Sequence, residues 1–285
     1  MKAETYTYLC PAKVNLFLYV LGKRPDGYHN IFTLFYPISL YDTLILEKSN
    51  KTEIICSQKG IPLDDNNIII KTHNILKEKY NLHDNFKIEL IKNIPSGAGL
   101  GGGSSDAANY LKAVNEISCL GLDYDKMAEI MAMVGSDTVF FLKDIPQLAM
   151  GRGTELSAAP KLPDLYFLII NPNIHVSTKE IYNSKNLELT NPNTINMIKK
   201  EYTFEELKSI MKNDMQKAVF LMHKEVKDIV DFLNNYTNGK ALMSGSGSTV
   251  FAVYPDKSSQ EDAFNKAKSN FKTYFIEKAA VAARG

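Results

Sequence analysis

The first part of the chain is dominated by residues that favour β-strands. Residues 6–46 are rich in Tyr, Phe, Leu, Ile, Val and Thr, and the polar cluster KRPDG at 23–27 divides them as a turn. Residues 52–56 predict a further strand. Residues 67–80 then carry apolar side chains at helical spacing, and residues 86–90 alternate between apolar and charged positions as in a half-buried strand.

A glycine-rich loop at residues 97–103 follows this strand and is expected to open directly onto a helix. Ser104, Ser105 and Asp106 stand before the helical pattern AANYLKAVNEI, and Ser and Asp are preferred residues at the start of a helix. Residues 127–134 predict a second, short helix. The loop is thus expected to lie between two regular elements.

In the second half of the chain, a new series of predicted strands and helices begins after two prolines. Pro160 and Pro163 suppress regular structure and make 158–164 the best candidate for a domain boundary. Strands are predicted at 165–170, at 241–254 as a pair around SGSGS, and at 273–276, and helices at 204–211, 218–233 and 259–271. Strands followed by helices and a mixed second half indicate an α+β fold, with domains at 1–157 and 165–285.

Composition narrows the classes of function. The 285 residues are 45% hydrophobic and 23% charged, which suits one large domain or two ordinary ones. Lys and Arg together number 33 against 32 Asp and Glu, so a net charge of +1 argues against a protein whose main role is to bind nucleic acid. Only Arg24, Arg152 and Arg284 are arginines, so anion binding must rely on lysine or backbone amides.

Cysteine use and the apolar runs indicate a cytoplasmic protein. The three cysteines form no CxxC pair and cannot build a disulfide framework in a chain this long. The start of the chain lacks the apolar region of a signal peptide, and no apolar run reaches the roughly 18 residues of a membrane span. We therefore expect neither secretion nor a membrane-spanning segment.

The segment PSGAGLGGGSSDAA, residues 95–108, carries the strongest chemical signal. Glycines let backbone amides approach an anion closely, and a helix N-terminus adds roughly +0.5 of an elementary charge, which together favour a phosphate cradle. The flanking elements disfavour a flexible linker, and no Gly-Lys-Ser/Thr follows, which excludes a Walker A motif. Gly97, Gly99 and Gly102 also satisfy the dinucleotide fingerprint GxGxxG, but a second helix follows where that fold has a strand. An NAD(P)-dependent oxidoreductase and a non-catalytic nucleotide-binding module stay open as alternatives.

Three further polar residues are candidates for chemistry. Lys13 interrupts the apolar strand PAKVNLFLYV and by itself is more simply a lysine on a solvated face, but Asn15 at i+2 points to the same side. Asp137, in VGSDTVFF, is by spacing alone more simply a cap or turn residue. If it faces Lys13, the carboxylate would stay ionised and could accept a proton from an attacking hydroxyl.

Aromatic and small residues supply weaker candidates. Tyr28 and His29 follow the RPDG turn and could stack on and hydrogen-bond a base, or simply anchor a loop. The five histidines have no ligand spacing, which argues against a zinc site. MSGSGSTVFAV, residues 243–253, is either a hairpin or a place where backbone approaches a ligand closely.

In their order along the chain, these segments resemble the GHMP small-molecule kinases, named for galactokinase, homoserine kinase, mevalonate kinase and phosphomevalonate kinase. The resemblance covers nearly the whole chain and is weakest at 186–200. The pairing of GYHN with GLGGGSSD is specific to the members that act on a cytidine diphosphate conjugate of methylerythritol. The carrying segments are PAKVNLFLYVLGKRPDGYHNI at 11–31, PSGAGLGGGSSDAA at 95–108, GSD at 135–137, ND at 213–214 and MSGSGSTVFAV at 243–253.

The resemblance implies a two-domain α+β GHMP kinase fold with the active site in the cleft between the domains. Residues 1–157 would form the ATP-binding N-terminal domain and 165–285 the C-terminal domain. The implied activity uses ATP and Mg²⁺ to phosphorylate the 2-hydroxyl of 4-diphosphocytidyl-2-C-methyl-D-erythritol, in the non-mevalonate route to isopentenyl diphosphate. The expected partner is this small molecule, with no nucleic acid or membrane, and the sequence leaves a monomer and a homodimer open.

The resemblance also assigns roles to residues, although none to a metal ligand. It implies that Lys13 and Asp137 are the catalytic pair. It places Asn15, Tyr28 and His29 in the substrate pocket, with Tyr182 stacking on the cytosine. The cradle of the ATP phosphates would comprise Pro95, Ser96, Gly97, Ala98, Gly99, Leu100, Gly101, Gly102, Gly103, Ser104 and Ser105.

Two positions depart from the family pattern. Val139 stands where the family often has proline, two places after Asp137. Thr154 stands in GRGTEL where a glutamate is frequent. Neither residue occupies a position to which a catalytic role is carried over.

Overall fold

A computed structural model describes residues 4–282 of the chain, and contacts between residues divide it into two compact units. Unit 1 contains the described residues up to Ala12, with Leu40–Ser96 and Gly101–Asp144. Unit 2 contains Lys13–Ser39, Gly97–Leu100 and the described residues from Ile145 onward. The units interleave along the chain, whereas the predicted domains are continuous, and those domain bounds stay a prediction. Arg284 lies outside the described residues.

Two long strands, β1 (Thr5–Lys23) and β2 (His29–Ser49), pair with each other around the turn predicted from KRPDG. In unit 1, β4 (Asn85–Ile91) runs antiparallel to β2 and parallel to β3 (Glu53–Ile55). The alternation predicted for residues 86–90 of β4 is confirmed, since Phe86, Ile88 and Leu90 are buried and the charged residues between them are exposed. This pattern places one face of the strand against a core and the other in water.

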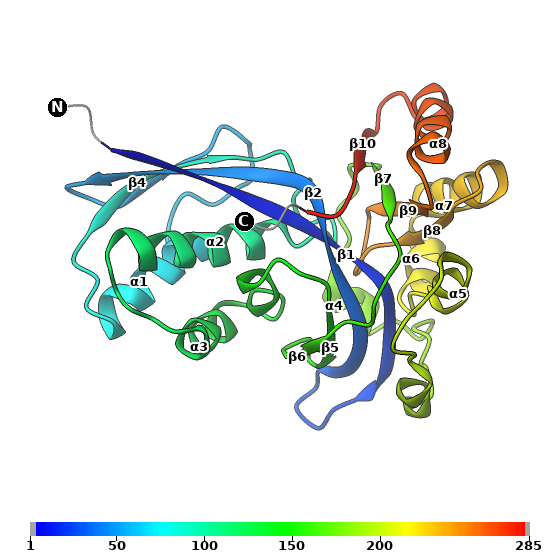
Figure 1. Ribbon diagram of the computed structural model, residues 1–285, viewed down its shortest axis with the longest axis horizontal. Helices are drawn as coiled ribbons and strands as arrows, with labels where there is room; N and C mark the ends of the chain where they lie inside the picture. The colour runs from blue at the N-terminus through cyan, green and yellow to red at the C-terminus, as the bar shows by residue number, and fades with distance from the viewer. Residues whose placement is uncertain (1–3, 283–285) are drawn as a thin grey trace. The chain divides into compact units, whose positions relative to one another are not determined.

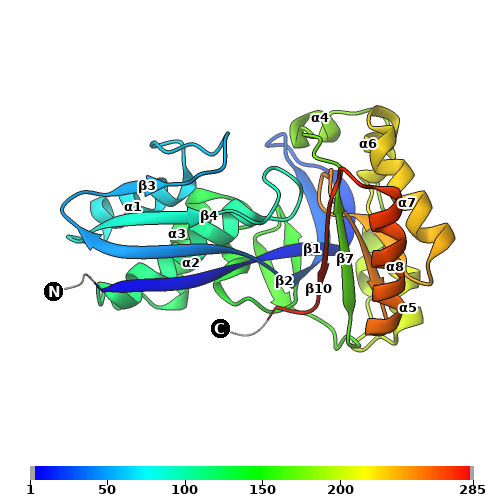
Figure 2. The same ribbon diagram turned by 90° about the horizontal axis from the view of Figure 1, so that it is seen from above.

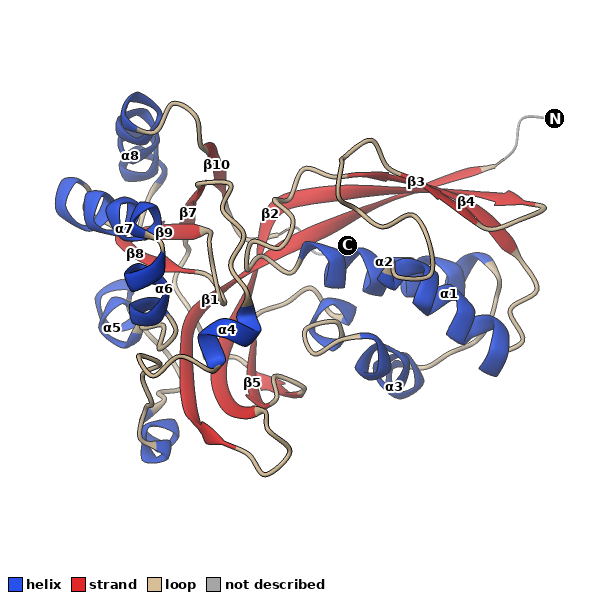
Figure 3. Cartoon of the chain, turned by 180° about the vertical axis from the view of Figure 1, so that it is seen from behind, coloured by secondary structure: helices blue, strands red, loops and turns tan. Residues whose placement is uncertain are grey.

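Helices gather on one face of the unit 1 sheet (Figures 1 and 3). His73 and Tyr110 join the first two of them through a buried hydrogen bond of 2.7 Å between imidazole Nδ1 and the phenol oxygen. The predicted helices at 67–80 and 127–134 are confirmed, while the apolar run VFFL forms a short 3₁₀ helix. The helical elements are α1 (Ile68–Lys79), α2 (Gly102–Ile117), α3 (Tyr124–Val134) and η1 (Val139–Leu142).

Unit 2 contains a hairpin that extends β2 and a separate four-stranded sheet. In the hairpin, β5 (Gln147–Gly151) runs antiparallel to β2 and β6 (Glu155–Ala158) runs antiparallel to β5. The other sheet is antiparallel throughout, in the order β10-β7-β9-β8, and confirms the strands predicted for this part. Its members are β7 (Tyr166–Asn171), β8 (Lys240–Met243), β9 (Val250–Tyr254) and β10 (Phe275–Ala279).

Helices α7 and α8 pack against the four-stranded sheet (Figure 2). The single helix predicted over 218–233 is wrong, because two helices meet at His223, whose φ of −134° and ψ of 89° are not helical. The helices predicted at 204–211 and 259–271 are confirmed. The helical elements of unit 2 are α4 (Thr178–Tyr182), η2 (Pro192–Met197), α5 (Phe204–Ile210), α6 (Gln216–Met222), α7 (Lys224–Tyr236) and α8 (Lys257–Asn270). Helices and mainly antiparallel strands together confirm the α+β class.

Side-chain amides occupy the outer edge of β8, the last strand of this sheet. Asn234 accepts the backbone N–H of Ala241 at 2.9 Å and donates to its carbonyl at 3.5 Å. Gln216 accepts the N–H of Met243 at 3.0 Å, and Asn213 donates to the Met243 carbonyl at 2.8 Å. The backbone N–H and C=O groups of Ala241 and Met243 are therefore hydrogen-bonded on this edge, although no strand of the described residues lies beside it.

Candidate active site

Lys13 and Asn15 lie on the same side of β1, as their spacing predicts, but this side is not solvated. Lys13 is 3% and Asn15 2% exposed. The Lys13 ammonium donates to Asn15 Oδ1 at 2.7 Å and lies 5.0 Å from the centroid of the Phe35 ring. The amide of Asn15 donates in turn to the hydroxyl of Thr33 at 2.8 Å. The interpretation of Lys13 as a lysine on a solvated strand face is therefore wrong.

The middle of the glycine loop, Gly97–Leu100, docks on the SGSGS turn and on β1. Ser244 donates its hydroxyl to the Gly99 carbonyl at 2.8 Å, and the N–H of Thr249 donates to the Ala98 carbonyl at 3.3 Å. The N–H of Lys13 donates to the Leu100 carbonyl at 2.9 Å. Two segments with glycines, far apart in the sequence, are thus joined through their backbones beside Lys13.

Gly99 is required by this docking. Its φ is +79°, and a Cβ placed on it would lie 2.1 Å from the Ser244 carbonyl oxygen. Gly245 approaches from the other side, where a Cβ would lie 3.2 Å from the Gly99 carbonyl oxygen and 3.6 Å from Asn15 Oδ1. The SGSGS segment is therefore a hairpin turn, as predicted, and also a place of close backbone approach, here to the glycine loop.

The end of the loop forms the start of α2 one turn earlier than predicted. Gly101 is the residue before the helix, with a left-handed φ of 71°, and no side chain caps the first turn. Ser104, Ser105 and Asp106 lie inside the helix, so the prediction that they precede and cap it is wrong. An uncapped N-terminus whose first residues are glycines has backbone N–H groups with no side-chain partner, which fits a phosphate cradle.

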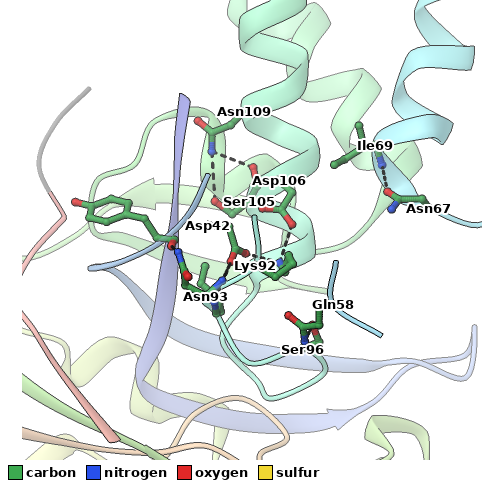
Figure 4. A network of polar contacts seen from close by, with 12 residues as sticks. Asp42, Gln58, Asn67, Ile69, Lys92, Asn93, Ser96, Ser105, Asp106 and Asn109 are labelled. Atoms are coloured by element: carbon green, nitrogen blue, oxygen red, sulfur yellow. Dashed lines mark hydrogen bonds and ion pairs between the residues drawn. The ribbon is translucent and has the colours of Figure 1, made fainter. Parts of the chain in front are cut away.

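A buried ion network lies beneath this helix start (Figure 4). Lys92 donates to Asp42 and, at 2.8 Å, to Asp106, and all three side chains are at most 3% exposed. Asp42 also accepts the backbone N–H groups of Asn93 at 2.6 Å and Ile94 at 2.8 Å. The network therefore fixes the chain that leads into Pro95 and ties it to α2.

The network shifts the protonation of its members. Burial, with a smaller contribution from Asp42, raises the pKa of Asp106 to about 8, although the nearby Lys92 ammonium opposes the shift. Burial would lower the pKa of Lys92, but the two carboxylates outweigh it and raise that pKa. One oxygen of Asp106, Oδ1, is buried with no hydrogen-bond partner.

Asp137 lies in the short connection between α3 and η1 and is half-buried. The next residue, Thr138, is fully buried and donates its hydroxyl to the carbonyls of Met131 at 2.6 Å and Gly135 at 2.8 Å. These bonds hold the GSD segment against the end of α3. Asp137 belongs to unit 1 and Lys13 to unit 2, and their action as a pair stays a prediction.

Two of the three predicted base-binding residues are in contact. His29, the first residue of β2, stacks on Tyr182, the last residue of α4, with 4.8 Å between ring centroids and 14° between ring planes. Burial, assisted by the charge of Lys23, lowers the pKa of His29. Tyr28 is 53% exposed and carries the guanidinium of Arg152 over its ring.

The sequence did not single out Lys92, Asp42, His175 or the partner of Tyr28 as site residues. A Cβ on Gly97 would lie 3.4 Å from His175 Nδ1, so this exposed imidazole borders the glycine loop. Lys92 directly follows β4 and Asp42 lies within β2, so nothing but their contact in the structure marks them as partners. The one sequence signal was the scarcity of arginine, which makes Arg152 unusual wherever it lies.

A cavity lies away from the predicted site residues, and the described residues show neither a cluster of metal-binding side chains nor a membrane-spanning helix. A cavity of about 520 Å³, lined mainly by residues 211–213, α6, α7 and β8, contains none of the predicted site residues in its lining. Within residues 4–282, no group of three or more His, Cys, Asp or Glu side chains is arranged to hold a metal ion. In the same range, no helix has the length and apolar character needed to cross a bilayer.

Comparison with known proteins decides the family. A family model described as the GHMP kinases N terminal domain matches residues 67–144, and one described as GHMP kinases C terminal matches residues 200–273. The chain belongs to the GHMP kinases. This GHMP kinase is therefore an ATP-dependent phosphotransferase with a small-molecule substrate, and the dinucleotide interpretation of its GxGxxG is not supported.

Individual relatives of this GHMP kinase share one name. The 4-diphosphocytidyl-2-C-methyl-D-erythritol kinase of Geobacter sp. (strain M21) is 39% identical over 90% of this chain and 91% of its own. The enzyme of that name from Syntrophus aciditrophicus (strain SB) is 38% identical over 90% of this chain and 92% of its own. A crystal structure of 4-(cytidine 5'-diphospho)-2C-methyl-D-erythritol kinase has a TM-score of 0.76 and 27% identity, and the match covers 97% of this chain and 100% of that one.

Proposed function

We propose that this GHMP kinase transfers the γ-phosphoryl group of ATP to the 2-hydroxyl of 4-diphosphocytidyl-2-C-methyl-D-erythritol. The observation that carries the proposal is the stacking of His29 on Tyr182. The half-exposed ring of Tyr28 precedes His29 directly in the chain. Rings of this kind form a platform for a nucleobase, which a small polyol or amino-acid substrate does not need. The names of the relatives above support the same substrate.

The glycine loop is proposed to hold the ATP phosphates. Gly101 and the glycines that begin α2 leave backbone N–H groups without a side-chain cap, and the helix dipole favours negative charge there. The docking of Gly99 on Ser244 holds residues 97–100 within unit 2, and the network of Lys92 holds the start of α2 within unit 1. Positioning and electrostatics of this kind supply most of the catalysis in phosphoryl transfer.

Lys13 and Asp137 are proposed to act on the transferred group. The oxygen of the substrate hydroxyl forms a bond to the γ-phosphorus, the bond from that phosphorus to the β–γ bridging oxygen breaks, and ADP leaves. Asp137 accepts the hydroxyl proton, a contribution of about 10²–10⁴ in rate where it holds. The Lys13 ammonium would offset the negative charge of the carboxylate and of the phosphoryl oxygens, and Asn15 holds that ammonium in place.

Mg²⁺ is proposed to arrive with ATP and not in a site of its own. Bound to the phosphates, it would neutralise the charge that develops on their oxygens. Asp137 is the one carboxylate among the predicted site residues, and it is half-buried and so accessible to such an ion. The Ser105 hydroxyl is a poorer ligand, because it is fully buried and accepts from Asn109.

We further propose that the enzyme works in the cytoplasm on its small-molecule substrate, without a nucleic-acid partner. The free state of Cys10, Cys56 and Cys119 supports a reducing compartment, and the net charge of +1 gives no general attraction for a polyanion. A monomer and a homodimer are both compatible with this activity.

An ADP-release assay tests the substrate. The purified enzyme is offered ATP and Mg²⁺ with the cytidylated methylerythritol and, separately, with mevalonate, homoserine, galactose and uncytidylated methylerythritol phosphate. We expect efficient turnover of the cytidylated compound alone. Comparable turnover of methylerythritol phosphate, or preference for another acceptor, would overturn the assignment and point to another GHMP kinase activity.

A further inference from the structure

Arg152 covers one face of the Tyr28 ring. Its guanidinium carbon lies 3.8 Å from the ring centroid, well inside the roughly 6 Å of a cation–π contact. Tyr28 remains 53% exposed, and within residues 4–282 no second ring or cation contacts it. The pair therefore has one side fixed by the protein and a large area of aromatic surface still available.

Strand register brings the two residues together. Gly151, the last residue of β5, pairs with Ile31 in β2, so that the next residue, Arg152, lies beside the chain that enters β2. Within that chain the backbone N–H of Tyr28 donates to Asp26 at 3.1 Å, and its carbonyl accepts from the N–H of Arg24 at 2.7 Å. The backbone of Tyr28 is fixed by these bonds, and Arg152 is the group that restrains its side chain.

We propose that Arg152 is a positioning residue for base recognition, holding the Tyr28 ring so that its open face can stack on the cytosine of the substrate. This inference rests on the proposed function. A guanidinium is planar and stacks on an aromatic face, whereas an ammonium is a compact point charge, so the pairing suits arginine better than lysine. The chain has only three arginines. The carboxylate of Asp26, which accepts the N–H of Tyr28, lies close enough that the charge of Arg152 helps to lower its pKa.

The effect is expected in affinity for the base and not in the chemical step. A ring that is already ordered loses less side-chain freedom when the base binds, so the complex is stronger. The strength of an exposed cation–π contact corresponds to about a two- to fivefold change in dissociation constant. The KM for ATP and kcat are expected to stay within about twofold, because Tyr28 serves the base and not the phosphates.

Calorimetry and steady-state kinetics on the full chain test the proposal. Arg152→Met, which keeps an unbranched apolar stem and removes the cation, should raise the Kd for cytidine 5'-diphosphate and the KM for the cytidylated substrate by two- to fivefold. Arg152→Lys should give intermediate values of Kd and KM. This variant is used for the test if Arg152→Met is poorly folded. Lys268→Met is the matched control, since Lys268 lies 5.2 Å from the Phe264 ring on α8 and its loss should change neither constant.

A double-mutant cycle separates positioning from a direct contact with the substrate. If Arg152 acts through the ring, Arg152→Met should have no effect on Kd in a Tyr28→Ala background. Equal losses in both backgrounds would overturn the proposal and indicate that the guanidinium contacts the ligand itself, for example its diphosphate. An unchanged Kd for Arg152→Met beside a wild type that binds cytidine 5'-diphosphate would overturn it and leave the proposed function intact. Failure of the wild type to bind cytidine 5'-diphosphate or to phosphorylate the conjugate would overturn both.

Discussion

His29 and Tyr182 stack face to face, with 4.8 Å between their ring centroids, although one begins β2 and the other ends α4. The resemblance alone made Tyr182 a candidate for base recognition, whereas His29 was also a candidate from its place beside Tyr28 after the RPDG turn. Their contact means that the end of α4 and the start of β2 present a joint aromatic surface. Removal of one ring is therefore expected to disturb the other.

Tyr182→Ala is expected to raise the KM for the cytidylated substrate by about tenfold or more, since stacking on an aromatic ring contributes roughly 1–3 kcal/mol per base. His29→Ala should do the same, while the KM for ATP stays nearly constant in both. Steady-state kinetics with each substrate varied in turn measures these values. Tyr236→Ala, which removes an exposed ring on α7, is the control. A parallel rise in both KM values would mean that these rings shape the whole site and not a base pocket.

Gly99→Ala is expected to lower the free energy of unfolding by at least about 1–2 kcal/mol, the cost of a left-handed backbone for a residue with a Cβ. The contact with the Ser244 carbonyl adds to this cost, because backbone atoms must move. Urea denaturation followed by circular dichroism measures the change.

Gly103→Ala gives the opposite sign and serves as the comparison for stability. Gly103 lies in α2, where a Cβ would meet only Ile68 Cδ1 at 3.6 Å, and alanine in a helix is about 0.5–1 kcal/mol more favourable than glycine. If both variants are equally stable, the docking of the loop on the SGSGS turn does not persist in solution.

Lys92→Met is expected to cost about 3–5 kcal/mol of stability, because it leaves the Asp42 carboxylate buried beside Asp106 without its cation. Unfolding by urea at pH 7 tests this. The exposed ion pair of Lys224 with Asp228 on α7 supplies the control, and Lys224→Met should change stability far less than Lys92→Met. If Lys92→Met lowers the free energy of unfolding only slightly, the two carboxyl groups are able to avoid a buried negative charge by binding a proton between them.

The pKa of Asp106 makes stability depend on pH. In the folded chain this pKa is raised from 3.8 to about 8, so between these two values the folded state holds a proton that the unfolded state has lost. The stability that Asp106 contributes is complete below about pH 4 and is lost as pH rises through about 8. Asp106→Asn should flatten this part of the stability profile, measured by urea denaturation from pH 5 to 9. An identical slope in variant and wild type would assign the pH dependence to other groups.

Asp137→Asn is expected to lower kcat by about 10²–10⁴ with little change in the KM for ATP, because the proposed loss is in proton transfer and not in binding. The ADP-release assay measures both constants. Asp125→Asn, on the exposed side of α3, should keep normal turnover. If Asp137→Asn retains most of the wild-type rate, Asp137 has no part in catalysis.

Local patterns predicted most elements of this fold, because strand alternation and helical spacing reflect burial by near neighbours. Strands β5 and β6 and helix α4 were not predicted, and two other deviations have specific causes. A left-handed Gly101 moves the start of α2 ahead of its serines, and the non-helical backbone of His223 divides one apolar pattern into two helices.

The candidate site was harder to predict than the elements that carry it. Spacing placed Lys13 and Asn15 on one face, but only the packed structure shows that this face is buried. Gly99 contacts Ser244, which lies 145 residues further along the chain. The contact of Tyr28 with Arg152 depends on the register between β5 and β2. Nothing in the local sequence of either residue encodes those contacts.

The amides along β8 also bear on how the protein behaves at high concentration. A bare sheet edge is a template on which another chain can add a strand, and such growth leads to aggregates. Asn213, Gln216 and Asn234 occupy the groups of β8 that an incoming strand would need. Replacing these three residues would keep the strand order of the sheet but leave the edge of β8 free to pair with another chain. These side chains therefore protect the protein from aggregation through this edge.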